Sequence, residues 1–123
     1  MADMLEQLKR IGLFAGLKPE AIHFIAKVAT EETHAAGTKI FQHGDVGDKL
    51  YLILDGILGV EVDGEQVAEM GPGTMVGERA ALEGGVRTAT LRAVTPCRVA
   101  VIPAELVGEG ELATLAADRH REE

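Results

Sequence analysis

A glutamate and an arginine, Glu78 and Arg87, stand nine residues apart on either side of a short turn that contains Gly84 and Gly85. A carboxylate accepts hydrogen bonds from hydroxyl groups, whereas a guanidinium offers a planar fork of donors that matches two phosphate oxygens. The pair is therefore suited to a ligand that carries both ribose-type hydroxyls and an anionic phosphate.

The residues that follow Glu78 favour the close approach of an anion. Residues 78–82 can form one helical turn, and the first N–H groups of such a turn attract negative charge. Ala80 and Ala81 are small enough to let a phosphate approach the backbone. The segment from Gly77 to Arg87 is thus the candidate binding site.

Size and charge bound the class of protein. With 123 residues, 46% of them apolar, the chain fits one domain with its own hydrophobic core. A formal charge of −8 argues against the broad basic surface that binds DNA or RNA. An anionic ligand must therefore be captured by local geometry, because the net charge of the protein repels it.

The cysteine content and the N-terminus indicate a compartment. The single cysteine, Cys97, lies in the apolar run 94–102 and is interpreted as a small core residue, which fits a reducing environment. The N-terminus has neither the basic start nor the long apolar stretch of an export signal or membrane span. We therefore expect a cytoplasmic protein that makes no membrane contact.

Catalytic and metal-binding patterns are missing from the sequence. The four histidines are scattered, and no pair has the spacing of a metal site. Serine is absent, and Cys97 has no matched base. The Gly-Asp pairs within 44–48 are interpreted as turns, because a calcium loop needs twelve residues with alternating oxygen ligands. We expect neither an enzyme nor a bound metal.

The pattern of apolar residues predicts a β unit between two helical segments. Residues 1–32 are predicted to contain the N-terminal helices, and residues 104–123 a C-terminal helical segment with a hinge at 108–110. Residues 37–103 contain short β-rich runs separated by turn residues, which is typical of an antiparallel, jelly-roll-like β-roll. The predicted strands are 39–41, 50–54, 57–62, 66–70, 87–94 and 98–102.

Two Asp-Gly pairs are predicted to form hairpin turns. They are Asp55-Gly56 and Asp63-Gly64, and such turns need residues that adopt positive φ. The whole chain, residues 1–123, is accordingly expected to be a single domain, mainly β with flanking helices.

These segments together resemble the cyclic nucleotide-binding domain, a regulatory module of catabolite activator proteins, cyclic AMP-dependent kinase regulatory subunits and cyclic nucleotide-gated channels. The resemblance covers almost the whole chain. Its most specific part is residues 77–82 with 87–90, which is similar to the family's phosphate-binding cassette. Weaker markers are 13–17, 44–48 and 71–73.

The resemblance implies a role for each residue of the cassette. Glu78 would accept the ribose 2′-hydroxyl, Arg87 would pair with the cyclic phosphate, and backbone amides nearby would contribute. The residues implied to contact the ligand are Val76, Gly77, Glu78, Arg79, Ala80, Ala81, Arg87, Thr88 and Ala89.

Three positions depart from the family pattern. Val76 replaces a usual aromatic residue, Arg79 replaces a common aliphatic one, and Val86 stands where proline commonly precedes the arginine. Without that proline the turn is less preorganised, which lowers the expected affinity. Arg79 either adds a second cation near the phosphate or pairs with Glu83 at helical spacing.

The resemblance leaves the nucleotide base open. A hydroxyl at Thr88 can contact the amino group of a syn guanine, but threonine also occurs there where cyclic AMP is the ligand. Because every aromatic residue lies in the first half of the chain, Leu112, Leu115 or Arg119 would have to cover the base.

We expect a regulatory sensor that binds cyclic AMP in preference to cyclic GMP and transmits occupancy through its flanking helices. Such a module controls an effector domain or a protein partner. The alternative is a β-roll interaction domain that no longer binds nucleotide.

Overall fold

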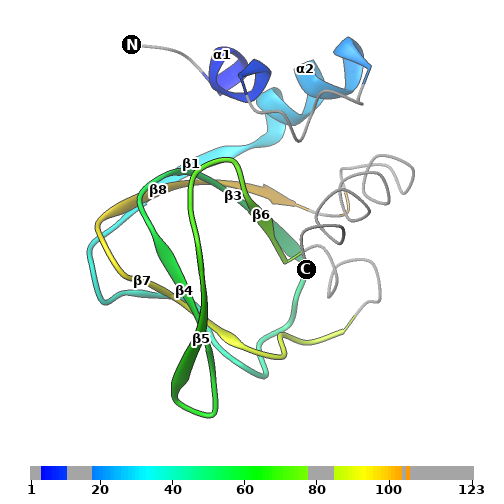
Figure 1. Ribbon diagram of the computed structural model, residues 1–123. Coiled ribbons are helices and arrows are strands. Elements are labelled where there is room, and N and C mark those ends of the chain that lie inside the picture. The colour runs from blue at the N-terminus through cyan, green and yellow to red at the C-terminus, as the bar shows by residue number, and fades with distance from the viewer. Residues whose placement is uncertain (1–3, 11–17, 78–84, 104, 106–123) are drawn as a thin grey trace.

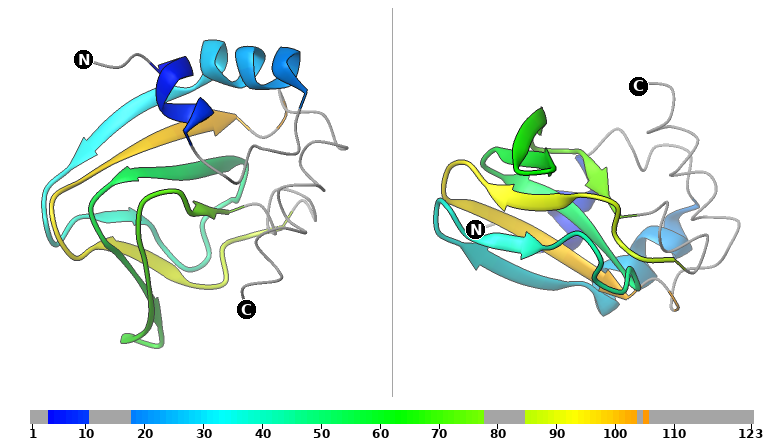
Figure 2. Two further views of the ribbon diagram at one scale, coloured as in Figure 1. Left: turned by 45° about the horizontal axis from the view of Figure 1, so that its top comes forward. Right: turned by 90° about the horizontal axis from the view of Figure 1, so that it is seen from below.

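The computed structural model describes residues 4–10, 18–77, 85–103 and 105 of the chain. Two helices, α1 (Met4–Lys9) and α2 (Pro19–Val28), lie over one of two four-stranded antiparallel sheets (Figures 1 and 2). Helix α2 begins at a proline, whose missing N–H costs nothing in the first turn of a helix. None of the described helices is long and apolar enough to cross a membrane.

The first sheet has the strand order β1-β8-β3-β6, and the second has the order β2-β7-β4-β5. The strands of the first sheet are β1 (Thr30–His34), β8 (Cys97–Pro103), β3 (Lys49–Asp55) and β6 (Met75–Val76). Those of the second are β2 (Lys39–Phe41), β7 (Thr90–Ala93), β4 (Leu58–Val62) and β5 (Glu65–Met70). The antiparallel β-roll predicted from the sequence is confirmed.

Strand β3 divides its side chains between two layers of core, because successive residues of a strand point to opposite faces. Leu50 and Leu52 pack with Leu8 of α1 and Ile25 of α2. Tyr51 and its alternate neighbours pack into the second layer, between the two sheets. The buried members of that layer are Tyr51, Ile53, Leu58, Val76, Leu91, Ala93, Cys97, Val99 and Val101.

The two predicted hairpin turns have different outcomes. Asp63 and Gly64 join β4 to β5 with φ values of 53° and 80°, so this hairpin is confirmed. Asp55-Gly56 is not a hairpin, because β3 and β4 belong to different sheets. Gly56 instead passes so close to β8 that a Cβ there would lie 2.5 Å from the carbonyl oxygen of Pro96.

Some predicted boundaries were wrong. The N-terminal helices end at Val28 rather than at residue 32, and residues Thr30–His34 form strand β1. This strand forms because it pairs along its full length with β8, a tertiary contact that outweighs local propensity. Strand β7 begins at Thr90 rather than at 87. The predicted hinge at 108–110 and the helical turn at 78–82 lie outside the described residues.

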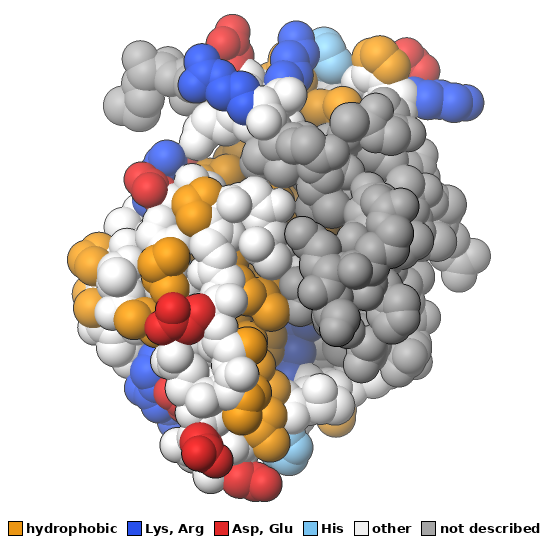
Figure 3. All heavy atoms as spheres, viewed as in Figure 1, with side chains coloured by type: hydrophobic (Ala, Val, Ile, Leu, Met, Phe, Trp, Pro, Cys, Tyr) orange, Lys and Arg blue, Asp and Glu red, His pale blue; other side chains and the backbone are white. Residues whose placement is uncertain are grey.

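Charge is distributed unevenly over the face of the molecule in Figure 3. Lysine and arginine side chains gather over α1 and α2, with acidic side chains among them, whereas acidic side chains lie at the tip of the β4–β5 hairpin.

Candidate ligand-binding site

Arg87 is the one buried charged side chain in the described part of the chain, with 4% of its surface exposed. It lies before β7, near the start of the described segment 85–103, which contains the second part of the predicted cassette. Burying a guanidinium is costly unless polar groups replace its water. The surroundings of this side chain therefore determine whether it can serve a ligand.

Two backbone carbonyl oxygens accept hydrogen bonds from the Arg87 guanidinium. Nη2 donates to the carbonyl of Lys49 at 2.6 Å, and Nη1 donates to the carbonyl of Gly77 at 3.1 Å. Lys49 begins strand β3, and Gly77 follows strand β6 directly. Because β3 and β6 are paired, the two acceptors belong to one rigid unit.

Two aromatic rings lie against the same guanidinium. The Arg87 Cζ atom is 4.3 Å from the ring centroid of Phe41 and 5.6 Å from that of Tyr51. Both distances lie within the range in which a cation is attracted to the face of a ring. The guanidinium is thus held by carbonyl groups and by aromatic rings.

Gly77 is required by this arrangement. Its φ of +96° lies in the left-handed region, which side chains rarely adopt. A Cβ at this position would lie 2.5 Å from Nη1 of Arg87 and 2.8 Å from the carbonyl oxygen of Lys49. The glycine predicted as part of the site therefore makes room for the arginine.

The loop between β2 and β3 braces the backbone around Arg87. The Gly44 N–H donates to the carbonyl of Arg87 at 2.8 Å, and the Arg87 N–H donates to the carbonyl of Asp45 at 2.7 Å. Val46 and Val86 form an antiparallel bridge beside them. The sequence showed the Gly-Asp pairs only as turn residues, and their contact with residues 85–87 was missed.

Burial raises the pKa of the Tyr51 hydroxyl above its usual value of 10.0, and the positive charge of Arg87 opposes this rise only in part. Tyr51 is therefore neutral at physiological pH. It can contribute an aromatic face and a neutral hydroxyl to the site, but not a negative charge.

The remaining predicted site residues fall into three groups. Val76 is 3% exposed and packs in the core between the sheets, opposite Tyr51. Thr88 is exposed, and Ala89 is partly buried just before β7. The other predicted ligand contacts, Glu78, Arg79, Ala80 and Ala81, lie outside the described residues, so the distance between Glu78 and Arg87 is not described.

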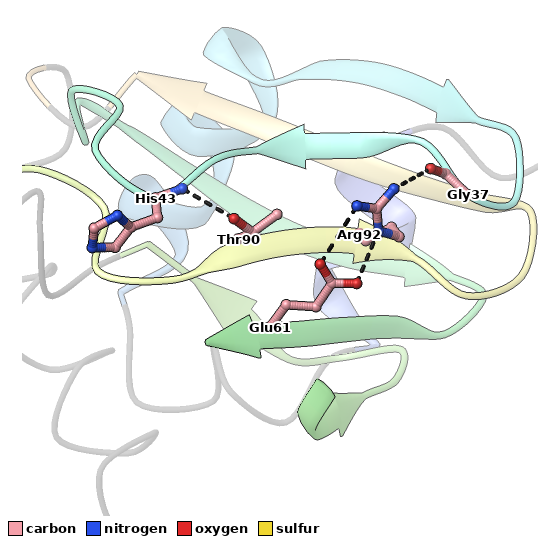
Figure 4. Close-up of polar contacts among 5 residues, drawn as sticks. All are labelled: Gly37, His43, Glu61, Thr90 and Arg92. Atoms are coloured by element: carbon pink, nitrogen blue, oxygen red, sulfur yellow. Dashed lines mark hydrogen bonds and ion pairs between the residues drawn. The ribbon is translucent and has the colours of Figure 1, made fainter. Parts of the chain in front are cut away.

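Strand β7, which continues from the site, is tied to its neighbours by polar contacts (Figure 4). The His43 N–H donates to Thr90 Oγ1 at 3.1 Å. Arg92 donates from Nε to Glu61 Oε2 at 2.9 Å and from Nη1 to the carbonyl of Gly37 at 2.9 Å. These contacts join β7 to the β2 region and to β4, which fixes the strand that leads away from Arg87.

No group of three or more His, Cys, Asp or Glu side chains that could hold a metal ion occurs among the residues described. The buried cation between the two sheets is instead a feature suited to an anionic ligand. The fold defines a class of protein, the antiparallel β-rolls with a helical layer packed on one sheet, and here Arg87 is buried between the two sheets.

The comparison with protein families makes the class specific. Residues 31–109 match the model of the cyclic nucleotide-binding domain, and this chain belongs to that family. The family is a regulatory, ligand-binding module rather than a catalytic one. The resemblance inferred from the sequence is thereby confirmed.

Relatives come from bacteria and eukaryotes. The chain is 33% identical over 100 residues to a CRP-like cAMP-activated global transcriptional regulator of Mycobacterium tuberculosis, covering 77% of this chain and 45% of that protein. It is 35% identical over 100 residues to a cAMP-dependent protein kinase regulatory subunit of Yarrowia lipolytica, covering 78% and 27%. The chain thus spans less than half the length of these relatives.

Solved structures with the same fold include the N-terminal domain of a transcriptional regulator from Streptomyces coelicolor. It is 30% identical, with a TM-score of 0.74 and coverage of 94% of this chain and 93% of that one. The regulatory subunit of a cAMP-independent protein kinase A from Trypanosoma brucei is 25% identical, with a TM-score of 0.85 and coverage of 96% and 43%.

Proposed function

We propose that this chain is a sensor module that binds cyclic AMP, with Arg87 as its phosphate contact. The observation that carries the proposal is the burial of this guanidinium between two carbonyl oxygens and two aromatic rings. Such a cation is fixed before the ligand arrives, so little side-chain entropy is lost on binding. In an acidic protein, a preorganised local cation is the means of holding an anion.

The trypanosomal relative supports the choice of Arg87. A variant of that subunit is bound to cAMP in the A site, and it carries three substitutions: glutamate to alanine, threonine seven positions later to arginine, and the next valine to alanine. In this chain Ala80 and Arg87 have the same separation. The alanine and arginine at this spacing are shared with the variant that is bound to cAMP, whereas Thr88 follows Arg87 where that variant has a second alanine.

The preference for cyclic AMP over cyclic GMP is part of the proposal. It is supported by the names of the bacterial and fungal relatives, which are described as cAMP-activated and cAMP-dependent. Thr88, which follows Arg87, is exposed and is therefore accessible to a base. Thr88→Ala should leave cyclic AMP binding nearly unchanged and should weaken any residual binding of cyclic GMP.

Glu78 is proposed to accept the ribose 2′-hydroxyl, since its carboxylate stands next to Gly77 in the chain. Arg79, Ala80, Ala81 and Ala89 complete the proposed ligand contacts. Val76, which was also predicted as a contact, is buried among the core residues, so we propose that it supports the turn that carries Gly77.

We also propose that ligand occupancy is passed through the flanking helices to an effector domain or protein partner. The regulators and kinase subunits among the relatives extend well beyond the matched region. Helices α1 and α2 pack directly on the sheet that contains β3, whose first residue, Lys49, binds Arg87. The carbonyl of Lys49 thus connects Arg87 to the strand on which the helical layer packs. We place the protein in the cytoplasm, where its free thiol, Cys97, stays reduced.

Calorimetry with cyclic AMP, cyclic GMP and adenosine tests the proposal. Cyclic AMP should bind more tightly than the other two ligands. Arg87→Ala should lower the affinity for cyclic AMP by roughly tenfold to a hundredfold, because it removes a charge-assisted contact. Arg98→Lys, at a partly exposed arginine on β8, is the control and should bind normally. Absence of binding by the wild-type protein would leave the interaction domain as the remaining interpretation.

A further inference from the structure

The aromatic pair beside Arg87 belongs to strands of opposite sheets. Phe41 ends β2 of the second sheet, whereas Tyr51 lies in β3 of the first. Their ring centroids are 5.6 Å apart, and the ring planes are inclined by 47°. The guanidinium of Arg87 thus lies against one ring from each sheet.

The rings of Phe41 and Tyr51 and the carbonyls of Lys49 and Gly77 together surround the guanidinium of Arg87, and we call these four groups the seat of the arginine. Tyr51 pairs with Val76 across the sheet, and Val76 is followed by Gly77, whose carbonyl accepts the bond from Nη1. Lys49, whose carbonyl accepts the bond from Nη2, precedes Tyr51 by two residues on β3. The two carbonyls set the direction in which Nη1 and Nη2 donate, and the two rings limit how the plane of the guanidinium can tilt and move.

These contacts hold the cation without cancelling its charge. Carbonyl oxygens and aromatic rings are neutral, and the face of a ring attracts a cation through its quadrupole. An aliphatic side chain would fill the space beside Arg87 but would lack this attraction. The chemistry of the rings, in addition to their volume, is therefore suited to holding an arginine that must meet an anion.

We propose that Phe41 and Tyr51 are positioning residues for Arg87, which hold its guanidinium where it meets the phosphate of the nucleotide. This inference rests on the proposed function of Arg87 as the phosphate contact. It goes beyond that function in assigning a role to two residues outside the cassette. In this role the rings affect ligand affinity only through the arginine.

A double-mutant cycle separates positioning from a general structural role. Phe41→Leu should lower the affinity for cyclic AMP by about 2- to 30-fold, the range of cation–π contributions. Phe41→Tyr, which keeps the aromatic face, should bind almost as well as the wild-type protein. In an Arg87→Gln background, Phe41→Leu should cause no further loss. An equal loss in both backgrounds would show that Phe41 acts through the fold, and would overturn the inference.

The second position has its own matched pair. Tyr51→Phe retains the ring and should keep the affinity, whereas Tyr51→Leu should lose affinity to a similar extent as Phe41→Leu. Equal affinities of Tyr51→Phe and Tyr51→Leu would count against a role for the ring. Thermal melts of each variant identify those that remain folded at the temperature of the measurement.

An NMR measurement on the ligand-free protein decides the inference even if nucleotide binding fails. The Arg87 Hδ and Hε protons should show upfield ring-current shifts that are reduced in Phe41→Leu and retained in Phe41→Tyr. Unchanged shifts in Phe41→Leu would reject the positioning role. A wild-type protein with these shifts but no affinity for cyclic AMP would contradict the proposed function and not the seat itself.

Discussion

The Nη2 atom of Arg87 donates a 2.6 Å hydrogen bond to the carbonyl oxygen of Lys49, a residue 38 positions earlier in the chain. This bond connects the cassette to the first residue of β3, at the start of a strand that is central to its sheet. The arginine proposed to bind the ligand is therefore also a structural residue. Its substitution should affect the stability of the protein as well as the affinity for nucleotide.

The first prediction concerns stability in the absence of ligand. Arg87→Ala leaves the partly buried carbonyls of Lys49 and Gly77 without this donor, and the loss of a hydrogen bond from a charged group costs about 1.5–3 kcal/mol. The midpoint of urea denaturation should therefore fall. Arg98→Ala, which removes a partly exposed arginine from β8, should have a smaller effect. If Arg87→Ala were as stable as the wild-type protein, the hydrogen bonds from Arg87 to Lys49 and Gly77 would not contribute to stability, and the prediction would be wrong.

The second prediction concerns Gly77. Gly77→Ala places a Cβ against Nη1 of Arg87 and the carbonyl of Lys49, and must displace the guanidinium. We expect calorimetry to show roughly a tenfold or greater loss of affinity for cyclic AMP, comparable to the loss of one charged hydrogen bond.

Gly64→Ala is the control for this variant. Gly64 also has a positive φ, of +80°, but no atom lies within 4 Å of a Cβ built there. It should lose some stability and keep its affinity for nucleotide. If Gly77→Ala bound cyclic AMP as tightly as Gly64→Ala does, the close contact with Arg87 would be irrelevant to binding.

The third prediction compares two glycines with the same positive φ. Gly56 and Gly37 both have a φ of +91°, so alanine at either position is placed in the left-handed region, at a cost of roughly 1–2 kcal/mol. A Cβ at Gly56 would also lie 2.6 Å from Cys97 Cβ, whereas a Cβ at Gly37 would meet nothing within 4 Å.

Urea denaturation should therefore show a larger loss for Gly56→Ala than for Gly37→Ala, by about 1–3 kcal/mol, which is typical of overpacking. Equal losses would mean that the chain can move away from β8 at little cost. In that case the close approach would not be what requires glycine at position 56.

The fourth prediction concerns pH and Cys97. Burial raises the pKa of this thiol above its usual value of 9.0. Well below pH 9.0 the thiol is protonated in both the folded and the unfolded chain. As the pH rises from 9.0 towards the folded pKa, only the unfolded chain loses its proton, so the free energy of unfolding decreases.

Denaturation curves measured between pH 8 and pH 10 test this effect. The wild-type protein should lose stability above pH 9.0 more steeply than Cys97→Ala, although the variant is less stable at pH 8 because it leaves a small cavity. Tyr51, whose pKa in the unfolded chain is 10.0, also ionises within this window, but it is present in both proteins and therefore cancels in the comparison. Parallel curves for the two proteins would contradict the raised pKa.

Much of the β-roll could be predicted because local signals are strong in this chain. Strand β2 was predicted at its observed bounds, and the Asp63-Gly64 hairpin has the positive φ values that its residue types favour. Strand β1 was missed because its Thr-Glu-Glu-Thr-His sequence lacks an apolar pattern. Its first four residues are exposed, and it forms through its pairing with β8.

By itself, the sequence determined the Asp63-Gly64 turn, most of the strands and the core position of Cys97, and it singled out Gly77 and Arg87 as candidate site residues. These features depend on residue type and on neighbours nearby in the chain. Only the tertiary structure decided that Asp55-Gly56 connects two sheets, that residues 44–48 brace the cassette, and that Phe41 and Lys49 hold the arginine. The reason is that these contacts join residues far apart in sequence, and a backbone carbonyl or a ring gains its partner only when the strands that carry it are paired and packed.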